Sequence, residues 1–165
     1  MNYQIEAMKE SDWAQVREIY LEGLATGNAT FETTAPNWED WDSGHLPHSR
    51  LVARSNNQVL GWAALSPVSK RQVYRGVAEV SVYVSESGRG KRIGSNLLKS
   101  LVESSEQNGI WTLQASIFPE NTASVNLHLQ FDFREAGKRE GIAKLAGVWR
   151  NTVILERRSK TVGIY

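Results

Sequence analysis

The sequence predicts an α/β fold, a single domain in which a mixed sheet is flanked by helices. Two kinds of apolar periodicity support this class. Short runs rich in β-branched residues alternate apolar and polar side chains, as in "GVAEVSVYV" (residues 76–84), which is typical of strands. Longer segments repeat apolar residues every three to four positions, which is typical of helices. The expected order is strand, helix, loop, three strands, helix, strand, helix and two strands.

The first elements are a short strand and a helix. Residues 3–7 alternate apolar and polar side chains and predict the strand. Ser11 is the expected N-cap of the helix, whose buried face is formed by Trp13, Val16, Ile19 and Tyr20. Residues 23–49 are rich in Gly, Thr, Pro and Trp and predict a long loop with a short helix near residues 38–41. Long loops in compact domains are often functional.

The remaining elements are bounded by turn residues. Residues 50–68 predict a hairpin that turns at Asn56-Asn57, and residues 76–84 predict the next strand. A helix is expected to begin at Ile93 or Gly94 and to stop at Asn108-Gly109; its apolar stripe is Ile93, Leu97, Leu98, Leu101 and Val102. Further elements are a strand at 111–117, a short helix capped by Asn121, and strands at 133–140 and 147–158.

Composition excludes several classes of function. The chain has 165 residues, so we expect one domain, residues 1–165. A net charge of +1 gives no basic field for nucleic acid or an anionic membrane surface. No apolar run approaches the ~20 residues that span a bilayer, and the first residues do not resemble a signal peptide. The absence of cysteine excludes disulfides and thiol nucleophiles and suits a cytoplasmic location.

A turn rich in glycine and cations precedes the second long helix. Gly88 and Gly90 allow the backbone to bend and to approach a ligand, and the first N–H groups of a helix favour an anion. Arg89, Lys91 and Arg92 add three positive side chains, so we expect a pyrophosphate site here. The P-loop and dinucleotide glycine patterns do not fit, and the glycine spacing alone leaves the cofactor open.

Two titratable residues are candidates for a catalytic role, and each also has an explanation that involves no function. Glu79 lies inside a predicted strand and faces away from Ala78 and Val80. It is either a charge exposed to solvent, with no function, or a carboxylate in a cleft. His128 lies on the predicted short helix. It is either a packed or exposed histidine with no function, or a group that transfers a proton near neutral pH. His45 and His48 have no third ligand at metal spacing, so no metal site is expected.

The strand, turn and helix of residues 80–98 resemble the acetyl-coenzyme A motif of the GCN5-related N-acetyltransferase (GNAT) family, [Q/R]-x-x-G-x-[G/A] after a strand. Arg89 matches the first position and Gly94 the last, whereas Arg92 stands where the family has Gly. Asp132 likewise replaces the Gly of the family's "LGF". The resemblance implies the GNAT fold, a mixed but mostly antiparallel sheet, with acetyl-CoA as co-substrate. The implied cofactor contacts are Val82, Tyr83, Val84, Arg89, Gly90, Lys91, Arg92, Ile93, Gly94, Ser95 and Asn121.

Within the family the chain resembles the phosphinothricin and methionine sulfone/sulfoximine N-acetyltransferases, through segments such as "TFET", "GWAALSPVS", "LQASIFPEN" and "GVWRNTVILERR". This implies that Glu79 is the general base and that His128 protonates the departing thiolate or positions the thioester. Members of this branch are commonly homodimers. The acceptor contacts that the resemblance and loop positions suggest are Phe31, Thr33, Tyr74, Arg75 and Trp149.

The leading hypothesis is therefore transfer of acetyl from acetyl-CoA to the α-amine of a small amino acid analogue, namely L-phosphinothricin, methionine sulfone or methionine sulfoximine. Direct attack in a ternary complex is expected, because the chain has no cysteine and no evident Ser-His-acid arrangement. An α-amine has a pKa of roughly 8, so a weak base suffices to free it of its proton. The alternatives are another amine acceptor (a polyamine, a peptide N-terminus or a lysine) and an inactive acetyl-CoA-binding domain.

Overall fold

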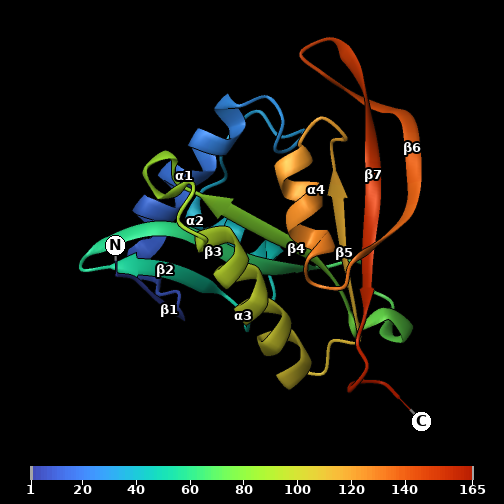
Figure 1. Ribbon diagram of the computed structural model, residues 1–165, viewed down its shortest axis with the longest axis horizontal. Helices are drawn as coiled ribbons and strands as arrows, with labels where there is room; N and C mark the ends of the chain where they lie inside the picture. Colours follow the sequence, from blue (N-terminus) through green and yellow to red (C-terminus); the bar gives the residue numbers. More distant parts are fainter. Residues whose placement is uncertain (1, 165) are drawn as a thin grey trace.

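The computed structural model, which describes residues 2–164, contains one seven-stranded sheet with helices on both faces (Figure 1). The strand order is β1-β2-β3-β4-β5-β7-β6, and β4 and β5 form the parallel pair of an otherwise antiparallel sheet. This confirms the predicted α/β class and element order. The elements are β1 (Gln4–Ala7), α1 (Trp13–Ala25), α2 (Trp38–Gly44), β2 (Leu51–Ser55), β3 (Gln58–Pro67), β4 (Val77–Val84), α3 (Ile93–Gln107), β5 (Thr112–Ile117), α4 (Thr122–Leu129), β6 (Arg134–Leu145) and β7 (Val148–Arg158).

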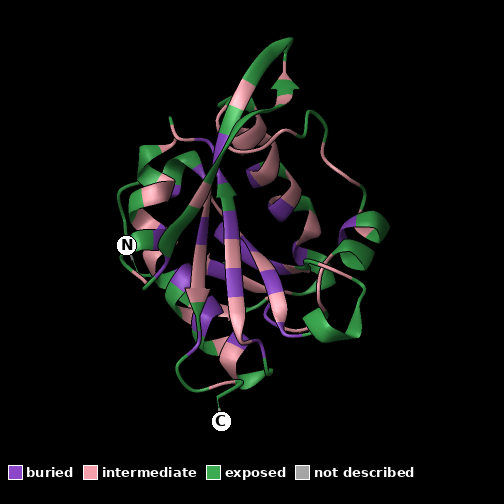
Figure 2. Ribbon diagram, turned by 90° about the vertical axis from the view of Figure 1, so that its right-hand side faces the viewer, coloured by how far each residue is buried: buried purple, intermediate pink, exposed green. Residues whose placement is uncertain are grey.

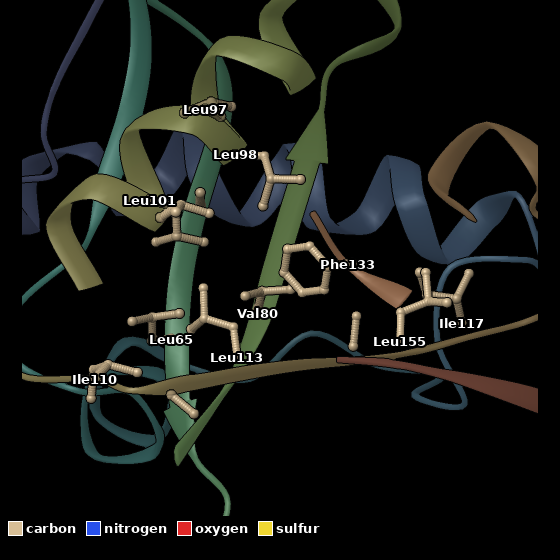
Figure 3. Close-up of a cluster of buried hydrophobic side chains, with 14 of the residues drawn as sticks. Leu65, Val80, Leu97, Leu98, Leu101, Ile110, Leu113, Ile117, Phe133 and Leu155 are labelled. Carbon is tan, nitrogen blue, oxygen red and sulfur yellow. The ribbon is translucent and has the colours of Figure 1, made fainter. Parts of the chain in front are cut away.

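The two faces of the sheet bury separate apolar clusters. On one face, Leu97, Leu98 and Leu101 of α3 pack onto Val80 and Leu113 of the sheet (Figure 3). The opposite face is covered by α1 and α2 through a cluster of aromatic and aliphatic side chains: Val16, Ile19, Trp41, Val52, Val59, Trp62 and Ala64. Burying a large apolar side chain contributes about 1.5–3 kcal/mol, so these clusters hold the helices on the sheet. Buried residues follow the central strands in Figure 2.

Strand β4 has the alternation predicted for it. Ala78 and Val80 are buried in the α3 cluster, and Val82 and Val84 pack against it. Tyr83 lies on the other face, where its ring stacks 4.9 Å from that of Trp62. Glu79 shares the face of Tyr83, since side chains two apart in a strand point the same way. The strand therefore carries its carboxylate on the α1 face.

Helix α3 begins at Ile93, as predicted, and its five predicted stripe residues are all buried. It is 15 residues long, and no helix within residues 2–164 has the length and apolarity needed to cross a membrane. Asn121 is the N-cap of α4, and its side-chain oxygen accepts a hydrogen bond from Ser124 N at 3.2 Å. Both helix starts were therefore readable from local sequence.

The predicted N-cap at Ser11 is wrong. A 3₁₀ turn spans Glu10–Asp12, and α1 begins at Trp13. Asp12 is only 4% exposed and accepts hydrogen bonds from Lys9 N at 2.9 Å and from Arg54 Nη2 at 2.9 Å. The ion pair with Arg54 on β2 fixes Asp12 at the helix entry, and Ser11 is left exposed.

Strands β4 and β5 pair over a short stretch and then part. Their register runs from Val77↔Thr112 to Glu79↔Gln114. Beyond it β4 continues with β3 as far as Val84, whereas β5 continues with β7 as far as Ile117 (Figure 1). Each strand keeps one hydrogen-bonded edge, and the edges that face each other open into a wedge. Backbone N–H and C=O groups on the open side of residues 80–84 are consequently available to a ligand.

The two departures from the family's glycines have the same backbone conformation. Arg92 has φ 60° and ψ 18°, and Asp132 has φ 65°, so both lie in the left-handed region. Glycine adopts this region without steric cost, whereas another L-residue pays roughly 1–2 kcal/mol. The chain therefore keeps the turn geometry of a glycine at both positions, at the expense of local strain.

Replacing Arg92 by Gly should therefore stabilise the protein. The strain of about 1–2 kcal/mol is relieved, and the greater freedom of glycine in the unfolded chain offsets about 0.4–1 kcal/mol. We expect Arg92→Gly to raise the free energy of unfolding by about 0.5–1 kcal/mol in urea denaturation without ligand. Arg92→Ala removes the same side chain but keeps the strain, and should show no such gain. A less stable Arg92→Gly protein would contradict this account.

Candidate active site

A cavity of about 810 Å³ occupies the wedge between β4 and β5. Its walls come from four parts of the chain: the loop after α1 (Thr26, Asn28–Glu32), β4 and the following turn (Glu79–Val84, Arg89), β5 and the turn into α4 (Ala115–Phe118), and α4 (Glu120–Ser124, Leu127, His128). Gly23 and Thr152 complete the lining. The parting of the two strands thus connects the α1 side of the sheet with α4.

Glu79 lies at the apex of the wedge. It is the last β4 residue paired with β5, and its side chain is partly buried. Gln114 lies directly opposite and donates a hydrogen bond from Nε2 to Glu79 Oε2 at 3.0 Å. This contact holds the carboxylate in one orientation at the bottom of the cavity. A carboxylate so placed can accept a proton from a group bound in the wedge.

His128 reaches the cavity from α4 and is only 4% exposed. Its Nδ1 lies 2.7 Å from Ser124 O, and its ring meets the ring of Phe133 edge-on. A carbonyl oxygen only accepts, so Nδ1 carries the hydrogen and neutral His128 presents Nε2 as an acceptor. Nε2 is buried without a hydrogen-bond partner among the described residues. Burial lowers the pKa of His128 below its ordinary value, which favours this neutral form near pH 7.

The predicted anion site is built from backbone as well as side chains. Arg89 lines the cavity, and Gly90 has φ 76°, which gives the turn its left-handed bend. Lys91 donates from Nζ to Ser87 O at 2.7 Å and so braces the turn. Arg92 is the N-cap of α3 and has no side-chain cap bond, so the first N–H groups of the helix, at Ile93, Gly94 and Ser95, point outward from its N-terminus. Ile93 is only 1% exposed and packs into the core cluster under α3, and it is not part of the cavity lining.

The cavity includes part of the predicted cofactor and acceptor residues. Val82, Tyr83, Val84, Arg89 and Asn121 line it, together with Phe31. The ring of Phe31 lies 4.9 Å from that of Phe118 in a T-shaped contact, which fixes the wall contributed by the loop. Thr33, two residues further along the same loop, is exposed and is not part of the lining.

Three predicted acceptor residues lie away from the cavity lining. Tyr74 is 45% exposed. Arg75 stacks on the ring of Trp111, with its guanidinium carbon 5.3 Å from the ring centroid. Trp149 is 62% exposed near the end of the β6–β7 hairpin, under Lys144. The structure thus brings Glu79 and His128 together with Phe31, but not with these three side chains.

Sequence reasoning missed Gln114 and Thr152. Gln114 had a signal, because in "TLQASI" it alternates with the apolar Leu113 and Ala115 and must face the side of the sheet that carries Glu79. Thr152 on β7 is 5% exposed, and its Oγ1 is buried without a hydrogen-bond partner among the described residues. A buried orphan hydroxyl in a cavity wall is a candidate ligand contact. Its position depends on the pairing of β7 with β5, which the local sequence does not specify.

The two loop histidines have structural partners. His45 stacks on Trp41 and places Nδ1 2.6 Å from Trp41 O. His48 pairs through Nδ1 with Ser49 Oγ at 2.7 Å. Within residues 2–164 there is no group of three or more His, Cys, Asp or Glu side chains that could hold a metal ion.

Comparison with known proteins identifies the family. The model of the acetyltransferase (GNAT) family matches residues 13–133. The chain is 31% identical to the phosphinothricin N-acetyltransferase of Alcaligenes faecalis over 163 residues, which covers 93% of this chain and 81% of that protein. The chain therefore belongs to the acetyltransferase (GNAT) family, and it is an acetyltransferase enzyme. The resemblance seen in the sequence is confirmed.

Two further relatives bear on the site. The L-methionine sulfoximine/L-methionine sulfone acetyltransferase of Pseudomonas aeruginosa is 31% identical over 106 residues, covering 64% of this chain and 62% of that protein. The crystal structure of a GNAT superfamily phosphinothricin acetyltransferase from Sinorhizobium meliloti in complex with AcCoA has a TM-score of 0.85 and 28% identity, covering 100% of this chain and 96% of that one. The fold of this chain is thus the GNAT fold.

The burial of His128 predicts a pH dependence of stability. Its folded pKa is lowered, so below the unfolded value of ~6.5 the unfolded chain takes up a proton that the folded protein does not. Stability from this group is therefore complete above pH ~6.5 and falls as the pH falls below it, by at most about 1.4 kcal/mol per pH unit.

Urea unfolding at pH 7.5 and 5.5 should show a smaller loss of stability for His128→Asn than for the unchanged protein. The pKa of His45 is also lowered by burial, so His45→Gln serves as the comparison that retains the contribution of His128. An equal loss in the unchanged protein and in His128→Asn would contradict the account.

Proposed function

We propose that this enzyme transfers the acetyl group of acetyl-CoA to the α-amine of a small amino acid analogue, such as L-phosphinothricin, methionine sulfone or methionine sulfoximine, by direct attack in a ternary complex. One observation carries the proposal: Glu79 and His128 line the same cavity between β4 and β5. The names of the relatives support the choice of acceptor.

The chain's own residues fit acetyl-CoA. The open backbone edge of residues 80–84 suits the amides of the pantetheine arm, which can add alongside β4 much as a strand does. Arg89 and the first N–H groups of α3 suit the pyrophosphate. Asn121 lines the cavity, and its Nδ2 is a hydrogen-bond donor. When bound, acetyl-CoA supplies the acetyl group as an activated thioester.

Glu79 takes the role of general base. Only a neutral amine attacks a carbonyl carbon, and an α-amine with a pKa of roughly 8 is mostly protonated at pH 7. The carboxylate oriented by Gln114 accepts that proton, directly or through one water. Freeing an α-amine of its proton costs about 1.4 kcal/mol for each pH unit below the pKa of the amine, so a weak base suffices.

His128 acts first as a hydrogen-bond acceptor. Nε2 lacks a proton in the neutral form and has no partner among the described residues. When the bound acceptor opens a path to Nε2, this atom can accept a hydrogen bond from an N–H group of the amine and align the amine for attack. Protonation of the thiolate by His128 requires that Nε2 has gained a proton in an earlier step. A thiolate with a pKa near 8.5 leaves without much assistance, so positioning is the larger contribution.

The acceptor is proposed to bind against Phe31 on the α1 side of the wedge, with Thr33 beyond it. Contact with Tyr74, Arg75 or Trp149 requires an acceptor that extends past the cavity wall. A homodimer in the cytoplasm is part of the same proposal. The exposed apolar residues of the β6–β7 hairpin, Ile142, Val148 and Trp149, and the lack of cysteine support it.

The test follows release of coenzyme A thiol from acetyl-CoA with the three amino acid analogues, beside spermidine and a peptide with a free N-terminus. We expect saturable release with the analogues. Glu79→Gln should lower turnover on the order of 10²-fold, the range for a general base, and leave acetyl-CoA binding intact.

Glu156→Gln is the matched control for this test. Glu156 lies opposite Gln114 on β7, outside the cavity lining, and pairs with Arg134 on the surface. Its replacement should leave turnover unchanged. Release with only the polyamine or peptide would replace the proposed acceptor, and full activity of Glu79→Gln would remove the base assignment.

The anion site has its own test. Arg89→Glu reverses a charge in the cavity lining, in the turn before α3, and should weaken acetyl-CoA binding by about tenfold or more in calorimetry. Lys99→Glu makes the same change on an exposed face of α3 outside this cavity and should bind normally. Equal affinity of the Arg89→Glu and unchanged proteins would refute the pyrophosphate assignment.

A further inference from the structure

Arg150 of β7 connects the C-terminal hairpin to the loop that follows α1. Its Nη1 donates to Gly27 O at 2.9 Å, and its Nη2 donates to Asn28 Oδ1 at 2.8 Å. Nη2 also pairs with Glu120 Oε2 at 3.4 Å. The guanidinium carbon lies 4.0 Å from the centroid of the Phe118 ring. One side chain thus joins the loop to the turn between β5 and α4.

The loop depends on such contacts for its conformation. Residues 26–37 connect α1 to α2 without a helix or strand, yet six residues between Thr26 and Glu32 form one wall of the cavity. Asn121 adds a second tie, from Nδ2 to Asn28 O at 3.2 Å. Asn28 is therefore held through its side chain by Arg150 and through its backbone by Asn121. The Phe31–Phe118 contact lies beside these ties.

Arg150 holds the cavity wall without forming part of it. It is absent from the cavity lining, whereas Asn28, Phe31, Phe118, Glu120 and Asn121 all belong to it. Its side chain is 16% exposed, and its guanidinium donates to three oxygens from two segments of chain. A loop that is already ordered loses less conformational entropy when the ligand binds, which strengthens binding.

We propose that Arg150 is a positioning residue that fixes residues 27–32 as a preformed wall for the amine acceptor and thereby sets acceptor affinity. The inference rests on the proposed acetyl transfer for its kinetic consequence. Loss of the guanidinium frees the loop, so the acceptor must order it on binding, and KM for the acceptor rises. The proposed contacts on β4 and at the N-terminus of α3 do not involve Arg150, and Asn121 keeps its own cap contact with Ser124, so acetyl-CoA affinity changes little.

The experiment compares Arg150→Met and Arg150→Lys with the unchanged enzyme. We expect Arg150→Met to raise KM for the acceptor about tenfold, with kcat reduced less and the acetyl-CoA dissociation constant within about twofold. Arg150→Lys keeps the charge but not the fork of donors, and should recover part of the loss.

Arg157→Met is the matched control. Arg157 lies on the same strand, is 14% exposed and pairs with Glu106 of α3 at 3.0 Å, away from the cavity. This variant loses a comparable ion pair and should keep the KM of the unchanged enzyme. A raised KM in Arg157→Met as well would assign the effect to general destabilisation and overturn the proposal.

A measurement independent of activity keeps this proposal separate from the proposed function. Hydrogen exchange of peptides covering residues 26–32 should become faster in Arg150→Met and stay unchanged in Arg157→Met. If exchange is unchanged in Arg150→Met, Arg150 does not order residues 27–32, whether or not any acceptor is turned over. Faster exchange with an unchanged acceptor KM overturns the link to affinity.

Asn28→Ala completes the design and replaces Arg150→Met if that variant does not fold. It removes one of the two loop oxygens that Arg150 binds, so it should speed exchange in the same peptides. The effects on KM of Asn28→Ala and Arg150→Lys should combine to less than their product, because both act through one contact. If the double variant raises KM by the full product of the two single effects, Arg150 does not act through its contact with Asn28.

Discussion

The parting of β4 from β5 is the constraint on which the rest of the site depends. Parallel strands that stay paired leave no room between their edges, whereas here the pairing ends at Glu79↔Gln114. The two strands can separate because each keeps backbone hydrogen bonds on its outer edge, β4 with β3 and β5 with β7. At the apex, Glu79 is paired on both sides, with Ser66 of β3 and Gln114 of β5, and this pairing positions its carboxylate.

Two physically different walls face this apex. The α4 side presents a buried imidazole whose tautomer is set by the carbonyl of Ser124, so Nε2 is left as an acceptor without a partner among the described residues. The α1 side is a loop held by contacts with distant elements. Polar groups fixed in advance within a partly enclosed cavity interact more strongly with a ligand than the same groups in water. The arrangement suits a reaction that must bring an amine and a thioester into contact.

Local sequence predicted what depends on local physics. The apolar stripe of α3, the cap at Asn121 and the alternation of β4 were readable because they follow from helix and strand periods. The entry to α1 was misjudged because Asp12 is fixed by Arg54, more than forty residues away in the chain. Likewise, Thr152 and Arg150 lie in a hairpin whose sequence does not reveal which side chains reach the loop after α1. Their roles depend on the order β5-β7-β6 in the sheet.

The position of Arg150 in the chain has a consequence for how this enzyme can diverge. The family model ends at residue 133, before the β6–β7 hairpin, while the candidate base, the anion site and α4 all precede that point. The candidate residues for acetyl-CoA binding and catalysis thus precede residue 134, whereas Arg150, which contacts the loop after α1, follows it. If Arg150 holds the acceptor wall as proposed, substitutions at this position change acceptor binding while β4 and the N-terminus of α3 keep their own contacts, so the two halves of the site can diverge separately.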